Sequence, residues 1–491
     1  MSEHTPENID TAEATGTPPP VTPHPRRWRI LWLVGIAQLM LILDVTVVAI
    51  ALPHIGADLG LSREALTWVM SGYTLAFGGL LLLGGRAADL FGARRLVLIG
   101  LLMFVVASLV AGLAVSGPML LTGRVGQGVA AAMLSPAALS LVVTLFDGDE
   151  RNRALGIWSA LGGGGAALGV LLGGLLTGGP GWPWVFIVNV PVGFILLLTI
   201  RAQLPPQPRP AVTGRLDVLG AVLVTAATGT LIFALIRAGD AGWGGFTGIG
   251  LVVASVALYA GFVVRQLTAR SPLMDLRLLT RRPVATGTVL ILVATALMIM
   301  VFFLGTFYLQ QYQGFDPLTT GLLFLPVALA TMVGANLAGR VVGRLGARML
   351  GVVGLLVAAA GMTVPVLWDG TVAMVVGVTI AAAGTGVAFV VASATALGQI
   401  APHEAGLASG IVSTFHEFGA SIGAAVVSSM AAASITGAGA GAGAGSAGTG
   451  TAGFERGFTT GAIVAIAAAL VVLFITPRPP VANADPIGDN T

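Results

Sequence analysis

The chain of 491 residues is 56% hydrophobic and only 9% charged, with a net charge of +3. Soluble domains carry about 25% charged residues, so this composition excludes a soluble protein and indicates an all-α protein that crosses a membrane many times. Cysteine is absent, and all 24 basic residues are arginine. These absences exclude disulfides and thiolate metal sites and argue against an ATP-driven pump with a phosphate-binding lysine. The five histidines lack metal-ligand spacing, so we expect no cofactor.

Residues 1–27 contain four acids and no apolar run, which predicts a disordered cytoplasmic tail and not a signal peptide. The stretches that follow include fourteen that are apolar and long enough to cross a hydrocarbon core of ~30 Å. They begin near Trp28, Leu66, Leu96, Leu120, Ala154, Trp184, Leu219, Ile249, Ala285, Gly321, Leu350, Val372, Gly406 and Thr459. Residues 478–491 form a second tail, and an even number of spans places both tails on one side of the membrane.

The arginines provide a test of this count. With both tails in the cytoplasm, twenty arginines fall in cytoplasmic segments and three, Arg63, Arg237 and Arg456, fall outside. Arg124 remains within the fourth span. Cytoplasmic loops of membrane proteins carry an excess of Lys and Arg, so this distribution favours fourteen spans with cytoplasmic termini.

Two loops carry the same sequence pattern. Residues 85–95 read GRAADLFGARR, and residues 339–349 read GRVVGRLGARM. Each loop follows the second span of a set of six, which predicts two copies of one six-helix bundle with two helices inserted between them. Repeats of this kind are typical of transporters whose halves move about a central site.

The repeat divides the chain into expected domains. The N-terminal bundle is expected at 28–202, the two inserted helices and a cytoplasmic linker at 203–282, and the C-terminal bundle at 283–477. Within the last, residues 437–453 read GAGAGAGAGSAGTGTAG and are expected to form a flexible external loop.

Five motifs resemble those of the major facilitator superfamily, and together they resemble its fourteen-span drug:proton antiporters. GRAADLFGARR resembles the loop signature of the superfamily, and LLTGRVGQGVAAA in the fourth span resembles its R-x-x-Q-G motif. GAALGVLLGG in the fifth span resembles the antiporter motif. LDVTVVAIALP and WPWVFIVNVP are similar to signatures of the first and sixth spans. The resemblance extends from about Trp28 to Pro477 and implies a major facilitator fold.

The chain departs from these motifs at three positions. Ala49 stands where the signature of the first span has Asn, and Val170 stands where the antiporter motif has Pro. Gly343, in the second loop, occupies the place of Asp89 in the first.

Two ionisable residues lie within spans of the first bundle. Asp44 is near the middle of the first span, where a charge costs about 2.5–3.5 kcal/mol on insertion scales, so such residues usually face a cavity. Arg124 shares one helical face with Gln127 and Gly128, which favours an inward position beside an acid. We expect Asp44 to bind and release a proton, and the resemblance links Arg124 to proton transfer. The alternatives are a structural hydrogen-bond acceptor and a fixed ion pair.

Glu417, within STFHEFGASIG of span 13, is the other acid well inside a span. We predict that it is a second proton site or binds a cationic substrate. Its neighbour His416 points about 100° away on a helix, so we expect a structural role for that residue.

Two further sets of residues are expected to act in conformational change. In the loop between spans 2 and 3, an acid that pairs with a group across the interface between the halves would lock one conformation of the transporter. The alternative is that the charged residues of this loop only fix the topology of the chain in the membrane. This latch comprises Gly85, Asp89, Gly92, Arg94 and Arg95. In span 5, small residues spaced by four allow close helix packing, which the resemblance makes a moving seam. These residues are Gly165, Gly169 and Gly173, and Gly174 beside them belongs to the same predicted packing surface.

Aromatic and amide side chains suit the binding of an amphipathic organic molecule. The candidates are Trp68, Tyr73, Gln127, Gln310 and Gln311. Tryptophan and tyrosine also gather at membrane interfaces, which is the alternative role for those two.

These features predict a secondary transporter of the cell membrane, active as a monomer, that exports drug-like or antibiotic-like molecules in exchange for protons. It would need no cofactor besides the proton gradient and no nucleic-acid partner. A proton symporter that imports a nutrient is the main alternative, and the glycine motif of span 5 argues against it. An enzyme would need His, Cys or carboxylates clustered near one membrane face, and the sequence has no such cluster. A channel would leave the repeat unexplained.

Overall fold

The computed structural model describes residues 26–146, 148–204, 215–241, 246–397, 405–430 and 447–476, which form helices and contain no strand. The predicted tails at 1–27 and 478–491 lie outside the described residues except for Arg26 and Arg27. The predicted loop at 437–453 also lies outside them as far as Ser446. From Ala447 onward its last residues already belong to a helix.

The chain order of the helices gives two long sets separated by a hairpin. The first set is α1 (Arg27–Leu59), α2 (Arg63–Phe91), α3 (Ala93–Gly112), α4 (Gly117–Leu145), α5 (Gly148–Gly178), α6 (Trp184–Ile187) and α7 (Asn189–Gln203). The middle segment contains α8 (Val218–Ala241), α9 (Phe246–Thr268) and α10 (Leu276–Thr280). The second set is α11 (Arg282–Phe307), the π-helix η1 (Tyr308–Tyr312), α12 (Pro317–Leu323), α13 (Leu325–Leu345), α14 (Ala347–Leu367), α15 (Thr371–Leu397), α16 (Ala405–Met430) and α18 (Ala447–Ile475).

Among the described residues, 13 helical segments are long and apolar enough to cross a membrane. Helix α5, with 31 residues, is about 46 Å long at 1.5 Å per residue and supplies another crossing. The structure therefore agrees with the predicted fourteen spans. The sequence did not predict that the sixth span divides into α6 and α7 or that the tenth divides into α12 and α13.

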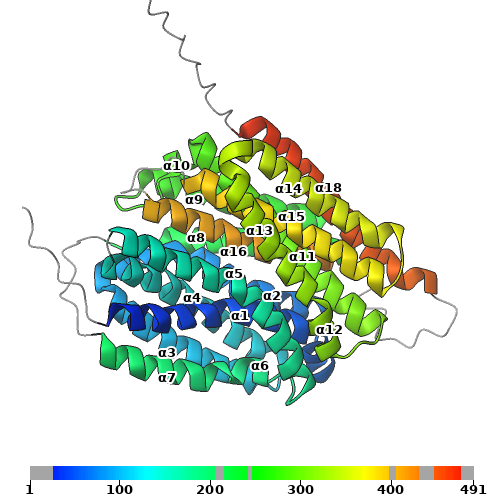
Figure 1. Cartoon of the computed structure of the whole chain (residues 1–491), viewed down its shortest axis with the longest axis horizontal. Coiled ribbons are helices and arrows are strands. Elements are labelled where there is room, and N and C mark those ends of the chain that lie inside the picture. Colours follow the sequence, from blue (N-terminus) through cyan, green and yellow to red (C-terminus); the bar gives the residue numbers. More distant parts are fainter. Residues whose placement is uncertain are drawn as a thin grey trace, which may run out of the picture.

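The two sets of helices are copies of one bundle, because their packing partners repeat. In the first set α1 packs on α5, α2 on α4, and α3 on both α4 and α7. In the second set α11 packs on α16, α13 on α15, and α14 on both α15 and α18. Figure 1 shows the first bundle (blue to cyan-green) beside the second (lime to red). The predicted internal repeat is confirmed.

The repeated loops also match in backbone conformation. Gly92 separates α2 from α3 with φ of 93°, and Gly346 separates α13 from α14 with φ of 79°. Side chains with a Cβ rarely adopt such positive φ values, so glycine lets the chain reverse between two spans in a single residue.

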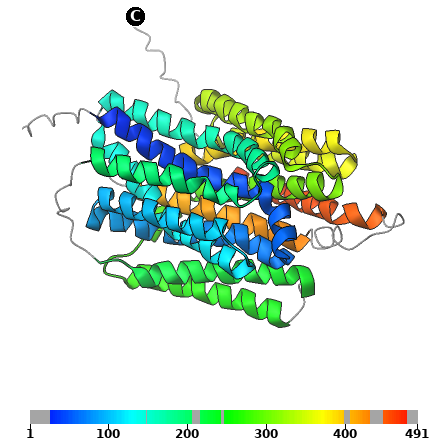
Figure 2. The ribbon, with the colours of Figure 1, turned by 90° about the horizontal axis from the view of Figure 1, so that it is seen from below.

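The inserted helices α8 and α9 form a hairpin along one flank of the molecule (Figure 2). Helix α8 contacts both α2 of the first bundle and α16 of the second. A Cβ added at Gly79 of α2 would lie 2.1 Å from the hydroxyl of Thr225, so this contact requires glycine. Directly before α8, the buried carboxylate of Asp217 accepts hydrogen bonds from Arg265 (Nε, 2.8 Å) and Gln266 (Nε2, 3.0 Å) of α9. These bonds hold the two helices of the hairpin together.

We call the face that carries Arg26 and Thr476 the terminal face and the opposite one the distal face. The described contacts that join the two bundles include two hydrogen-bonded contacts near the distal face. Gln310 of η1 donates from Nε2 to the carbonyl of Ile50 on α1 (2.9 Å). Arg63, at the start of α2, donates to the carbonyl and hydroxyl oxygens of Ser428 on α16.

A third contact near the distal face is made by backbone packing alone. A Cβ added at Gly174 of α5 would lie 2.6 Å from the carbonyl oxygen of Pro317, and one added at Gly321 would lie 2.9 Å from that of Val170. Helices α5 and α12 therefore touch through glycines on both sides, and the distal end of this interface is closed.

Candidate functional site

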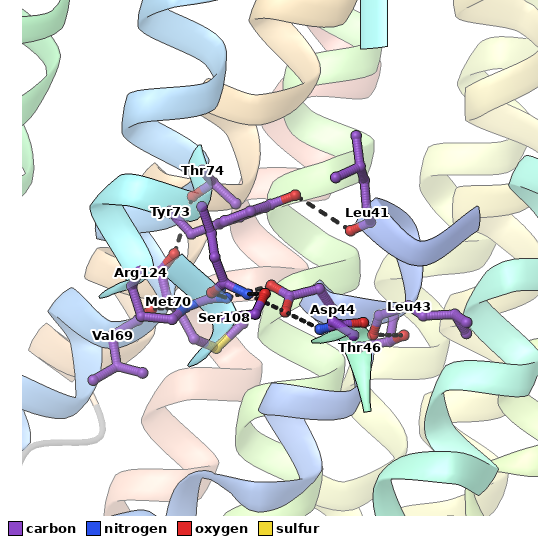
Figure 3. Close-up of polar contacts among 12 residues, drawn as sticks. Leu41, Leu43, Asp44, Thr46, Val69, Met70, Tyr73, Thr74, Ser108 and Arg124 are labelled. Atoms are coloured by element: carbon purple, nitrogen blue, oxygen red, sulfur yellow. Dashed lines mark hydrogen bonds and ion pairs between the residues drawn. The ribbon is translucent and has the colours of Figure 1, made fainter. Parts of the chain in front are cut away.

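An ion pair between Asp44 of α1 and Arg124 of α4 lies at the centre of the first bundle (Figure 3). Nη1 of Arg124 donates to Oδ2 of Asp44, and both residues are at most 2% exposed. The sequence predicted that Arg124 would lie beside an acid, and the structure shows that this acid is Asp44.

Amide side chains complete the bonding of this carboxylate. Oδ1 of Asp44 accepts from Nε2 of Gln127 (2.9 Å) and from Nδ2 of Asn189 (3.3 Å). Gln127 also donates to the hydroxyl of Ser108 (2.9 Å). The carboxylate thus accepts three hydrogen bonds, two from α4 and one from α7.

The guanidinium of Arg124 has additional partners. It donates to the carbonyl of Val69 (Nε, 2.9 Å) and to Oε1 of Gln127 (Nη1, 2.8 Å). Its Cζ lies 4.5 Å from the ring centroid of Tyr73 and 5.8 Å from that of Phe186, at cation–π distance. Arg124 would keep several of these contacts if Asp44 lost its charge.

Close packing of α2 and α4 positions this cluster. A Cβ added at Gly128 would lie 2.3 Å from the carbonyl oxygen of Tyr73, so only glycine allows the two helices to approach at this level. The approach brings the ring of Tyr73 beside Arg124, while its hydroxyl donates to the carbonyl of Leu41 (3.3 Å). The R-x-x-Q-G spacing therefore supplies the cation, the amide and the close contact from one helix.

Sequence reasoning missed two members of the cluster, Asn189 and Ser108. Asn189 is the one amide of the WPWVFIVNVP motif, which is a signal that could have identified it. Ser108 is a single hydroxyl in an apolar helix and gives no comparable signal.

Glu417 lies on α16, on the side that faces α2. Glu417 is 9% exposed. A Cβ added at Gly78 of α2 would lie 2.6 Å from the Cβ of Glu417, so the glycine leaves space for the Glu417 side chain. No hydrogen bond or ion pair reaches its carboxylate from the residues that the structure describes. Tyr73 interacts electrostatically with both Asp44 and Glu417. The expected structural role of His416 fits its hydrogen bond to Thr295 (2.9 Å).

The structure separates the five predicted substrate-binding residues. Tyr73 and Gln127 belong to the ion-pair cluster, and Gln310 lies between the two bundles. Trp68 lies on the flank beside the inserted hairpin, in an apolar hollow, and Gln311 is exposed near the distal face. The five residues therefore do not form one group in this conformation, because residues of one helix that differ in direction by 100° or more meet different neighbours. Their contact with substrate stays a prediction.

The predicted latch residues lie at the terminal face. Asp89 is 3.8 Å from Arg86 of its own helix, and its side chain is about half exposed. Arg94 donates to the carbonyl oxygens of Leu204 (2.7 Å) and Arg201 (3.3 Å), so it caps the end of α7. Gly92 forms the turn between α2 and α3 with a positive φ. A Cβ at Gly85 would be in ordinary contact with Pro136 (3.6 Å), and Arg95 is exposed. In this conformation Asp89 makes its ion pair within α2, not across the halves.

The four glycines of α5 divide between two interfaces. Cβ atoms added at Gly165, Gly169 and Gly173 would meet Ile42, Thr46 and Val47 of α1, so these three pack within the first bundle. Gly174 meets Pro317 of the second bundle. Of the predicted moving seam, only Gly174 therefore lies where the two halves meet.

Two repeated bundles that pack side by side, with a buried ion pair inside the first, have the architecture of a membrane transporter. The chain belongs to the Major Facilitator Superfamily, whose family model matches residues 34–424.

Curated relatives cover most of this chain. It is 39% identical to the "Puromycin resistance protein pur8" of Streptomyces alboniger, over 92% of this chain and 90% of the relative. It is 35% identical to the "Tetracenomycin C resistance and export protein" of Streptomyces glaucescens, over 84% and 77%. It is 36% identical to the "Cephamycin export protein CmcT" of Amycolatopsis lactamdurans, over 82% and 84%.

Solved structures support the fold. A bacterial homolog of the human lysosomal transporter Spinster, in an inward-facing and unoccupied conformation, matches with a TM-score of 0.67 and 16% identity, over 92% of this chain and 97% of that one. A peptide transporter, POT, in complex with alafosfalin matches with a TM-score of 0.63 and 16% identity, over 92% and 94%.

Proposed function

We propose that the protein exports drug-like or antibiotic-like organic molecules across the cell membrane in exchange for protons. The observation that carries this proposal is the buried Asp44–Arg124 pair, which can store one proton inside a duplicated transporter fold. The relatives named for puromycin resistance, tetracenomycin C export and cephamycin export support an antibiotic-like organic substrate. The protein works as a monomer in the lipid bilayer and uses the proton gradient in place of a cofactor.

The arginine distribution supports cytoplasmic termini, so the terminal face would be cytoplasmic and the distal face external. With the distal contacts closed, the conformation described here would be inward-facing. In the outward-facing conformation Asp89 would leave Arg86 and pair across the halves, and the α5–α12 contact at Gly174 would open.

The proton would act by changing the partners of Arg124. A proton that arrives from outside binds Oδ2 of Asp44 and removes the charge that Arg124 faces, while Arg124 keeps its bonds to Val69 and Gln127. Return of the proton to the cytoplasm restores the ion pair. Glu417, with no partner among the described residues, would be a second proton site or would bind a cationic group of the substrate.

The proton gradient is an adequate source of free energy. A membrane potential of 100 mV supplies about 2.3 kcal/mol for each charge that crosses. At about 1.4 kcal/mol for each factor of ten, one proton would sustain roughly a 50-fold gradient of a neutral substrate.

Transport into inverted membrane vesicles tests this function directly. Puromycin and a panel of other antibiotics and cationic dyes would be added outside, with and without an imposed acidic interior. We expect accumulation of at least one compound, several-fold higher with the pH gradient, because the vesicle interior corresponds to the outside of the cell. Accumulation that ignores the gradient would exclude antiport, and loss of compound from preloaded vesicles driven by the same gradient would indicate an importer.

A further inference from the structure

An apolar groove runs along the flank of the molecule between α2, α4 and the inserted hairpin. It consists of two adjoining hollows of about 570 and 390 Å³. Both hollows are lined by Trp68, Leu75 and Thr225. Neither Asp44 nor Arg124 lines it, and no step of the proposed transport cycle uses it.

The length of the groove matches one leaflet of a bilayer. Its lining follows α8 from Val222 to Phe233, which spans about 16 Å at 1.5 Å per residue. Half of a ~30 Å hydrocarbon core is about 15 Å. A single extended acyl chain that enters from one side therefore has the length of this groove.

A cation lies at the distal end of the groove. Arg237 is exposed one turn beyond Phe233 on α8, with its Cζ 5.2 Å from the centroid of that ring. Within the described part of the chain no acid pairs with it. Arg237 lies four residues before the end of α8, near the distal face, which is the side with few arginines in the predicted topology.

We propose that this groove binds an anionic phospholipid of the distal leaflet. One acyl chain lies in the groove against Trp68, Leu75 and Phe233, and the headgroup phosphate accepts hydrogen bonds from the guanidinium of Arg237. A planar guanidinium suits a phosphate because it can donate two parallel hydrogen bonds. The bound lipid fills the space between α2 and α8 and so supports the contact of Gly79 with Thr225.

Trp68 reports on the occupant of the groove, because brominated acyl chains quench nearby tryptophan fluorescence. The full-length protein would be placed in bilayers of brominated phosphatidylglycerol or brominated phosphatidylcholine. The signal of Trp68 among the 8 tryptophans is obtained by subtracting the Trp68→Phe variant. We expect half of the Trp68 quenching to need an about fivefold lower fraction of the anionic lipid than of phosphatidylcholine. A factor of about five is the preference that one cation near the membrane surface provides.

Two charge variants and one filling variant decide the proposal. Arg237→Gln should abolish the preference for the anionic lipid, whereas Arg456→Gln, at an exposed arginine on the same side of the membrane, should keep it. Ala226→Phe, at an exposed lining position, should occupy the groove and reduce quenching of Trp68 by both lipids. The proposal would be overturned by equal quenching of Trp68 by the two lipids or by unchanged quenching in Ala226→Phe. It would also be overturned if the preference for the anionic lipid survives Arg237→Gln or is lost in Arg456→Gln.

Discussion

Replacing Arg124 by methionine is expected to destabilise the protein by about 3–5 kcal/mol, because it leaves the carboxylate of Asp44 buried without its counter-charge. Transport should be lost as well. The free energy of unfolding of the purified protein in detergent, obtained from denaturant titration, measures the first effect. Accumulation of substrate in inverted vesicles measures the second.

The double variant Asp44→Asn/Arg124→Met separates stability from function. It removes both charges, so most of the lost stability should return, while transport stays absent because no group at this position can carry the proton. An Arg124→Met protein as stable as the natural one would contradict the buried pair. Transport by the double variant would contradict its role in coupling.

Replacing Gly174 by alanine is expected to lower transport at least tenfold. The added Cβ would lie 2.6 Å from the carbonyl oxygen of Pro317 and 3.1 Å from Cα of Leu318, and backbone atoms cannot turn aside as side chains can. Overpacking of this kind costs about 1–3 kcal/mol, which acts against the conformation with a closed distal face. The initial rate of transport into vesicles measures the effect.

Gly178→Ala is the matched control, one turn further along α5. Its added Cβ would lie 3.7 Å from the nearest atom, Leu318 N, so transport should stay within about twofold of the natural protein.

The natural chain has no cysteine, so a single Thr306→Cys replacement reports opening of the distal face through labelling by an impermeant maleimide added on that side. Labelling should rise with Gly174→Ala and stay constant with Gly178→Ala. Equal labelling in the two variants would contradict a closing seam at Gly174.

Most of the fold could be predicted because membrane spans have simple physical rules. Apolar length predicted the crossings, whereas the orientation that the arginines favour stays a prediction. The GRAADLFGARR and GRVVGRLGARM loops gave the duplication. The π-helix η1 and the short helix α10 could not be predicted, since neither changes the apolar pattern of its segment.

The site was only partly predictable, because a sequence gives the face of a helix but not its neighbour. Asp44 and Arg124 were recognisable as buried charges that needed partners. Their pairing depends on how α1 and α4 pack against each other, which no pattern in one helix reveals. Tyr73 and Gln127 were predicted to touch substrate, yet they pack around Arg124.

The exchange of one substrate for protons at Asp44 is the central claim, and the pH inside inverted vesicles tests it most directly. Vesicles would be prepared with an acidic interior that contains a pH-sensitive dye, and a compound that the protein accumulates would then be added outside. With the natural protein we expect the interior pH to rise as substrate enters. With Asp44→Asn, which removes the titratable group but keeps a side chain of similar shape, the interior should stay acidic although the compound still binds. An unchanged interior pH during transport by the natural protein, or an equal rise with Asp44→Asn, would contradict the account.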